Sequence, residues 1–119
     1  MRTNHVFAGI AVGDLTVARA WYERLFGRGP DLIPNDSEVA WQLNDSGWVY
    51  VVEDAERSGT ALLTLLVDDL ETVHGTLSER GIEVGSIEKI PGAAVQRMVL
   101  VDPDGNRITL GEPVAAPEA

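Results

Sequence analysis

The stretch Ala11-Val12-Gly13-Asp14-Leu15 decides the fold, because a stretch of the same kind, Leu66-Val67-Asp68-Asp69-Leu70, follows it 55 residues later. Each stretch ends an apolar run and opens a segment whose apolar residues recur at spacings of three and four, which predicts a buried strand followed by a helix. Asp14 and Asp69 are suited to cap those helices, since a short carboxylate accepts the free N–H groups of a first turn. The sequence therefore indicates two copies of one unit.

Three further strands are predicted after each helix. They lie around 30–33, 38–43 and 47–53 in the first half and around 82–90, 94–101 and 107–110 in the second, separated by turn-rich segments. This order predicts an α+β fold of two tandem βαβββ modules, about 5–53 and about 61–112. We expect residues 54–60 to link the modules and the tail 113–119 to be frayed.

The composition fits one domain over residues 1–119, with 45% hydrophobic and 24% charged residues. The chain has no cysteine, which excludes disulfides, thiolate nucleophiles and cysteine-bound zinc. No signal peptide or long apolar run is present, so we expect a cytoplasmic protein without a membrane partner. A net charge of −10 disfavours nucleic acid and favours cationic partners.

Three segments resemble the vicinal oxygen chelate superfamily, which includes glyoxalase I, bleomycin-resistance proteins and extradiol dioxygenases. They are Val12-Gly13-Asp14-Leu15 leading to Trp21-Tyr22-Glu23-Arg24-Leu25-Phe26-Gly27, the echo Val67-Asp68-Asp69-Leu70 leading to Ser78-Glu79-Arg80-Gly81, and Asp102-Pro103-Asp104-Gly105-Asn106-Arg107-Ile108-Thr109-Leu110. The resemblance implies a cupped, partly open mixed β-barrel with its helices outside. It also implies a ligand on the concave face, within one chain or across a homodimer.

Metal-dependent members that this chain resembles take one ligand from the first strand and one from the last strand of each module, commonly His and Glu. The matching positions here are Phe7, Tyr50, Leu62 and Thr109. Phenylalanine and leucine have no lone pair, and neutral tyrosine or threonine oxygens are weak ligands for a divalent ion. We therefore predict no metal and no other cofactor, which argues against glyoxalase, dioxygenase or epimerase chemistry that depends on a metal.

Alternation along the strands, counted from those four positions, predicts a cup lined by aromatic and aliphatic side chains with a few hydroxyls and one guanidinium. The candidate ligand-binding residues are Phe7, Trp48, Tyr50, Leu62, Thr64, Arg107 and Thr109. This lining suits a flat or amphipathic organic ligand. The alternative is that Phe7, Tyr50 and Leu62 pack against one another and close the cavity.

Three functions compete on this sequence. The first is a metal-independent, non-catalytic protein similar to bleomycin-resistance proteins, which sequesters an aromatic or cationic antibiotic or metabolite. The second is a lyase, isomerase or dioxygenase-like enzyme, either with a non-standard metal site around His5 or with Tyr50 and Arg107 as acid and oxyanion partner. The third is a regulatory subunit that binds a protein, which predicts a large exposed apolar patch and no small-molecule pocket.

Four more side chains have positions that the pattern suggests. Glu53 and Glu112 each lie three residues beyond a metal-ligand position, so an odd offset turns them to the opposite face, and we expect solvent-facing charges at strand ends. Trp41 could face the cup, the helix side or a dimer interface. Tyr22, at helical spacing beside Trp21, is expected in the core or an interface.

Overall fold

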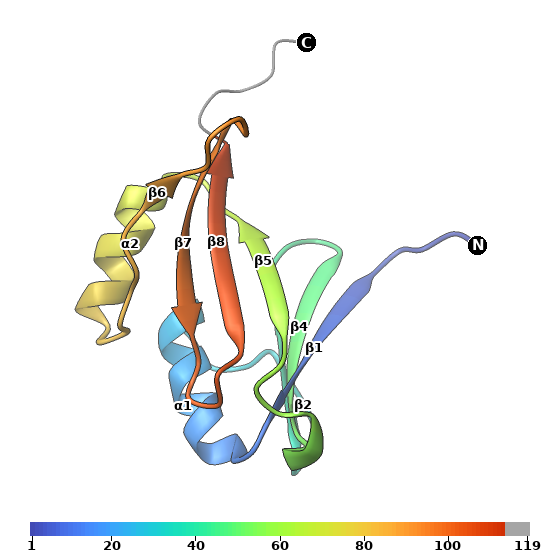
Figure 1. Cartoon of the computed structure of the whole chain (residues 1–119). Helices are drawn as coiled ribbons and strands as arrows, with labels where there is room; N and C mark the ends of the chain where they lie inside the picture. Colours follow the sequence, from blue (N-terminus) through green and yellow to red (C-terminus); the bar gives the residue numbers. More distant parts are fainter. Residues whose placement is uncertain (114–119) are drawn as a thin grey trace.

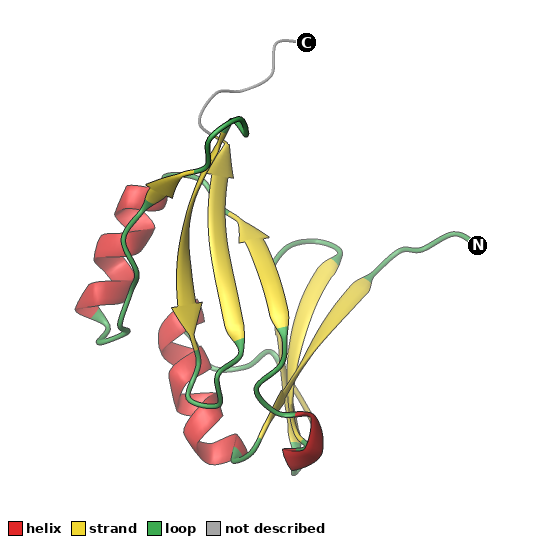
Figure 2. Cartoon of the chain, viewed as in Figure 1, coloured by secondary structure: helices red, strands yellow, loops and turns green. Residues whose placement is uncertain are grey.

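The structure, a computed structural model, describes residues 1–113 and contains two four-stranded mixed sheets of the same topology (Figures 1 and 2). The first sheet has the order β1-β4-β3-β2 and the second the order β5-β8-β7-β6. In each sheet the first strand pairs parallel with the last, and the remaining pairs are antiparallel. The strands are β1 (Val6–Val12), β2 (Leu32–Asn35), β3 (Glu38–Gln42), β4 (Gly47–Glu53), β5 (Leu62–Leu66), β6 (Glu88–Lys89), β7 (Val95–Val101) and β8 (Arg107–Pro113).

The two predicted βαβββ orders are found, but the sheets do not close into a barrel within the chain. The second half also differs from expectation at 82–90, where only Glu88–Lys89 form a strand. Gly85 lies in this segment, and glycine has low strand propensity. Pro113 ends β8 rather than opening a frayed tail, and the rest of that tail lies outside the described residues.

The two helices begin as the repeat predicts. In α1 (Leu15–Phe26) the Asp14 carboxylate accepts a hydrogen bond from the Val17 N–H at 3.2 Å, and in α2 (Leu70–Glu79) Asp69 accepts from the Thr72 N–H at 3.3 Å. Helix α1 ends at Gly27, whose φ of 75° suits glycine because it lacks a Cβ. A short 3₁₀ helix, η1 (Ala55–Arg57), lies between the halves. No helix among residues 1–113 is long and apolar enough to cross a bilayer.

Glu53 and Glu112 each accept hydrogen bonds from N–H groups at the N-terminus of the helix in their own half, so they are more than solvent-facing charges. The Leu15 N–H donates to Glu53 at 3.0 Å, and the Asp69 and Leu70 N–H groups donate to Glu112 at 2.6 and 3.0 Å. The free N–H groups at the start of a helix attract a carboxylate. The last strand of each half, β4 or β8, carries such a carboxylate near its end and places it beside the helix start. Glu53 is exposed at the end of its strand, as expected, but both carboxylates have a structural role that the expectation of solvent-facing charges did not include.

These bonds make Glu112 a source of pH dependence. Its pKa is lowered, first by the Leu70 N–H, then by the Gln96 side chain and the Asp69 N–H. A lowered folded pKa contributes stability above the unfolded pKa, and that stability is lost as pH falls through the folded value. We expect Glu112→Gln to be less stable than the wild type at pH 7 and to lose less stability on acidification, measured by urea unfolding between pH 7 and pH 3.

Glu56→Gln is the matched control, because Glu56 is an exposed glutamate in η1 whose side chain makes no hydrogen bond to any described residue. It should follow the wild-type curve. Parallel acid curves for Glu112→Gln and the wild type would refute the role of Glu112.

The inner faces of both sheets share one hydrophobic core with the helices. Ile10 of β1 and Val49 of β4 are buried on the same side as Met98 of β7 and Ile108 of β8. Trp41 also lies on this side, fully buried, and its Nε1–H donates to the Arg28 carbonyl at 3.1 Å. The inner face is thus the helix side for both sheets, which leaves the opposite faces pointing outward.

A buried polar cluster ties the two halves together. The Tyr22 hydroxyl donates to Asp102 at 2.8 Å, and the Asn106 amide donates to the same carboxylate oxygen at 2.8 Å and to the Ala11 carbonyl at 2.9 Å. The Asn106 side-chain oxygen accepts from the Ala61 N–H at 2.9 Å. Burial, then the charge of Asp102, raises the pKa of Tyr22 far above its usual value, so it stays protonated. The turn before β8 therefore binds α1, β1 and the start of β5.

Candidate functional site

The outer face of the first sheet carries Phe7, Trp48 and Tyr50, which we call the aromatic face. Phe7 lies beside Trp48 in the β1–β4 register, and their rings are stacked with centroids 5.2 Å apart and an interplanar angle of 17°. The Phe7 side chain is 50% exposed, and Trp48 and Tyr50 are half-buried. The three side chains thus form an aromatic surface open to solvent.

Gly9 shapes this surface by letting the Tyr50 ring lie across β1. A Cβ at position 9 would lie 2.5 Å from both Cζ and Oη of Tyr50. The sequence pattern did not predict this role, although a glycine inside a strand often marks the close approach of another group.

The outer face of the second sheet carries Leu62, Thr64, Arg107 and Thr109, which we call the polar face. Leu62 lies beside Arg107 and Thr64 beside Thr109 in the β5–β8 register. Leu62 is 81% exposed, and Arg107 is exposed with no ion pair to any carboxylate of residues 1–113. Arg97 of the neighbouring strand, by contrast, is paired with Glu88 at 3.3 Å. The polar face therefore offers two hydroxyls and one free guanidinium.

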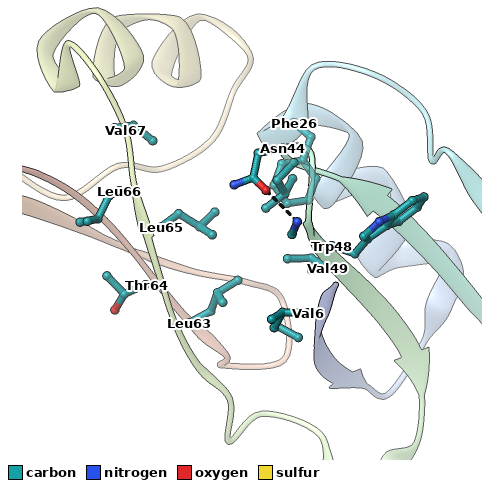
Figure 3. A pocket seen from close by; sticks show the side chains of 13 residues that line it. Val6, Phe26, Asn44, Trp48, Val49, Leu63, Thr64, Leu65, Leu66 and Val67 are labelled. Atoms are coloured by element: carbon teal, nitrogen blue, oxygen red, sulfur yellow. Dashed lines mark hydrogen bonds between the residues drawn. The ribbon is translucent and has the colours of Figure 1, made fainter. Parts of the chain in front are cut away.

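The two faces do not meet within one chain. Figure 3 shows Leu63 and Leu65 of β5 pointing towards the first sheet, whereas Thr64 and Leu66 point away from it. The inner faces of the two sheets are turned towards each other, so their outer faces point away from each other. The seven candidate residues are thus divided, three on the first sheet and four on the second, and Leu62 does not close a cavity with Phe7 and Tyr50.

A pocket of about 510 Å³ lies between the inner faces, where β5 approaches the starts of β1 and β4 (Figure 3). Of the candidate residues, Trp48 and Thr64 are part of its wall. Among the described residues that line it, the other polar side chain is that of Asn44, whose oxygen accepts from the N–H groups of Ser46 and Gly47. The rest of the lining is mainly aliphatic, including Val6, Ala8, Val49, Leu63, Leu65 and Val67.

The residues present do not fit the divalent ion that the resemblance implies. Phe7 and Tyr50 lie on the first sheet and Leu62 and Thr109 on the second, and none offers an imidazole or a carboxylate. Within the described part of the chain, no group of three or more His, Cys, Asp or Glu side chains could hold a metal. His5 is exposed, and its Nδ1 lies 3.2 Å from the side-chain oxygen of Asn4.

Comparison with solved structures places this fold among known proteins. A glyoxalase/bleomycin resistance protein from Catenulispora acidiphila is 40% identical, with a TM-score of 0.86 over 97% of this chain and 100% of that chain. The antibiotic binding protein TnmS3 from a Streptomyces species is 25% identical, with a TM-score of 0.70 over 95% and 96% of the two chains. Lactoylglutathione lyase from Agrobacterium tumefaciens shares the fold at 18% identity, with a TM-score of 0.74 over 90% and 91%.

No curated protein matches the chain. The sequence model of the glyoxalase/bleomycin resistance protein/dioxygenase superfamily, however, matches residues 2–110, which is nearly the whole chain. The repeat, the topology and this match agree, and the chain therefore belongs to the glyoxalase/bleomycin resistance protein/dioxygenase superfamily.

Proposed function

We propose that this protein is a metal-independent binding protein for a flat aromatic antibiotic or metabolite, and that it acts as a homodimer in the cytoplasm. The observation that carries the proposal is the solvent-open stack of Phe7 on Trp48, with Tyr50 beside it. Aromatic rings left exposed on the face of a sheet offer a large apolar area to a planar ligand. A relative described as an antibiotic binding protein supports the same class of function.

Two further observations support binding without a metal and without catalysis. The four positions that would hold the ion carry Phe7, Tyr50, Leu62 and Thr109, which form a poor donor set for a divalent cation. Within one chain, Tyr50 and Arg107 lie on the outer faces of different sheets, so they do not form an acid and oxyanion pair there. The acid and oxyanion pair that the enzyme alternative invokes is therefore not assembled within the single chain.

The test is a titration of protein treated with EDTA, followed by tryptophan fluorescence and calorimetry. The probes are bleomycin and three compounds with one ring system, namely 2-naphthoate, 2-naphthamide and 2-naphthylmethylammonium. Trp21 and Trp41 are buried, so a change in emission on binding reports mainly on Trp48. We expect at least one probe to give a saturating change and its affinity to be unaltered by added Zn²⁺ or Ni²⁺.

Trp48→Phe is the matched control, because it keeps an aromatic ring and should retain the calorimetric signal while losing most of the fluorescence change. Flat titrations with every probe by both methods would overturn the proposal. Binding that requires an added metal would overturn its metal-independent part.

Gly9→Ala is expected to weaken binding of the aromatic probe several-fold, because the new methyl group would displace the Tyr50 ring from its place over β1. Stability should change little, since the Tyr50 ring is the far end of a side chain that can move. Calorimetry and urea unfolding of the same variant separate the two effects.

Gly75→Ala serves as the comparison for this variant. Position 75 lies in α2 with no neighbouring atom within 4 Å of the added Cβ. This substitution should stabilise the protein by about 0.5–1 kcal/mol through helix propensity and leave binding unchanged. Equal probe affinity in Gly9→Ala and the wild type would exclude a role for the Tyr50 position in binding.

A further inference from the structure

The pocket between the inner faces interrupts the hydrophobic core of the chain. Its volume of about 510 Å³ lies within the range of about 300–1,000 Å³ that is typical of small-molecule sites. Several apolar side chains pack against the core but stay half-buried where they border the pocket, namely those of Ala8, Phe26, Leu43, Leu63, Leu65 and Val67. Water in such an apolar space makes few hydrogen bonds, so an apolar occupant is favoured.

Asn44 provides this pocket with a hydrogen-bond donor of fixed direction. Its side-chain oxygen accepts from the Ser46 and Gly47 N–H groups at 3.1 and 2.7 Å, which uses both lone pairs and fixes the orientation of the amide. Figure 3 shows this oxygen turned towards the backbone of its own turn and the amide nitrogen on the other side, towards β5. Among residues 1–113, no group accepts a hydrogen bond from that nitrogen.

The charge of the lining narrows the class of the ligand. None of the described residues that border the pocket is charged. An ion that enters such a pocket loses its water without meeting an opposite charge, which is unfavourable for carboxylates and ammonium groups alike. A neutral carbonyl group, by contrast, accepts the hydrogen bond that the Asn44 amide offers. The lining therefore favours a neutral apolar molecule with a carbonyl oxygen.

We propose that this pocket is a second ligand site, separate from the aromatic face, for a neutral aliphatic molecule that carries one carbonyl group. Its hydrocarbon chain lies against Leu63 and Leu65, which point from β5 towards the first sheet (Figure 3), and its carbonyl oxygen accepts from the Asn44 amide. Medium-chain ketones, esters and amides belong to this class. Phe7 and Tyr50 are not part of the wall, so the site goes beyond the proposed function, although Trp48 borders both sites.

The first test is calorimetric titration of the wild type with 2-octanone, octanoate and octylammonium, which share an eight-carbon chain. We expect 2-octanone to saturate one site per chain and to bind at least about tenfold more tightly than either ion, because no charged side chain borders the pocket. A wild type that binds no 2-octanone, or that binds either ion as tightly as the ketone, would overturn the proposal.

Asn44→Asp tests the assignment of the carbonyl group. Aspartate keeps an oxygen for the Ser46 and Gly47 N–H groups, so the turn should be retained, but it replaces the amide donor with a second acceptor. We expect 2-octanone to bind about tenfold more weakly and octylammonium more tightly than in the wild type.

Asn35→Asp is the matched control for this charge. The Asn35 oxygen accepts from the Ser37 N–H at 2.9 Å in a similar turn, and Asn35 does not border the pocket. This variant should keep the wild-type affinities for both compounds. An Asn44→Asp protein with the same order of affinities as the wild type would show that the amide does not select the ligand.

Ala8→Leu tests the location of the site, because it fills the pocket from the inner face of β1. The larger side chain covers apolar neighbours that are half-buried, so the fold should be retained while 2-octanone binding is lost, as thermal unfolding and calorimetry measure. Ala20→Leu makes the same change at an exposed position on α1 and should bind normally. An Ala8→Leu protein that binds 2-octanone as tightly as the wild type would place the ketone elsewhere.

Sedimentation identifies a competing occupant of the pocket, namely a second copy of the chain. If that copy fills the pocket in solution, the wild type binds no 2-octanone and Ala8→Leu shifts the protein towards the monomer. This pair of results would overturn the ligand site. Binding of 2-octanone with an unchanged sedimentation coefficient would support it.

Discussion

Asn106→Ala is expected to lower the free energy of unfolding by about 3 kcal/mol, the largest loss of stability that we anticipate from one substitution outside the apolar core. Asn106 is fully buried, and its amide satisfies the Ala11 carbonyl, the Asp102 carboxylate and the Ala61 N–H. Alanine would leave one buried polar group, the Asp102 carboxylate, and two partly buried ones, the Ala11 carbonyl and the Ala61 N–H, without that partner. Each such group costs about 1–3 kcal/mol when no water replaces the lost bond.

Urea unfolding followed by circular dichroism measures this loss as a shift of the midpoint at unchanged slope. Asn4→Ala, at an exposed position near the N-terminus, is the matched asparagine control and should leave the midpoint unchanged. A loss below about 1 kcal/mol for Asn106→Ala would mean that water enters the cluster and takes over its bonds.

Tyr22→Phe separates the two contacts of the Asp102 oxygen. The phenol donates to Asp102 at 2.8 Å, but the Asn106 amide donates to the same oxygen, so the carboxylate keeps a partner when the hydroxyl is removed. We expect a smaller loss, about 1 kcal/mol. The double variant should lose a different amount from the sum of the single losses, because the two side chains share one acceptor.

Local pattern predicted those parts of the fold that are decided within a few residues. The repeat at Asp14 and Asp69 predicted both helix starts, and alternation along β1 and β4 predicted which side chains share a face with Phe7 and Tyr50. The strand expected over 82–90 was reduced to two residues, because local apolar content does not decide where a ladder partner lies. Sequence periodicity thus gives the face of a strand more securely than its length.

The local sequence pattern did not predict how the two sheets pack together. It depends on contacts such as Tyr22 to Asp102, which are 80 residues apart in the sequence, and on the single core that the inner faces share. The roles of Glu53 and Glu112 were missed for the same reason, since each cap forms between a strand end and a distant helix start. Their equal offset from Tyr50 and Thr109 was the available signal, because equivalent charges in both halves indicate a shared structural role.

Joint replacement of Phe7 and Trp48 by alanine is expected to weaken binding of the aromatic probe by about 100-fold, the largest effect on affinity from the aromatic face. Stacking on an aromatic side chain contributes about 1–3 kcal/mol per ring, and 1.4 kcal/mol corresponds to a factor of ten. The two rings are already stacked on each other at 5.2 Å, so removal of one also leaves the other free to turn. We therefore expect each single variant to lose more than half of the free energy lost by the double variant.

Calorimetry of the two single variants and the double variant gives the coupling, and thermal unfolding checks that each remains folded, as expected for side chains on an outer face. Leu65→Ala distinguishes this site from the pocket between the inner faces, because Leu65 points into that pocket and not towards the aromatic face (Figure 3). A ligand on the aromatic face should be lost in the double variant and largely retained in Leu65→Ala. Because Trp48 also lines the inner pocket, the result for Leu65→Ala decides between the two sites, and loss of binding in that variant would assign the ligand to the inner pocket.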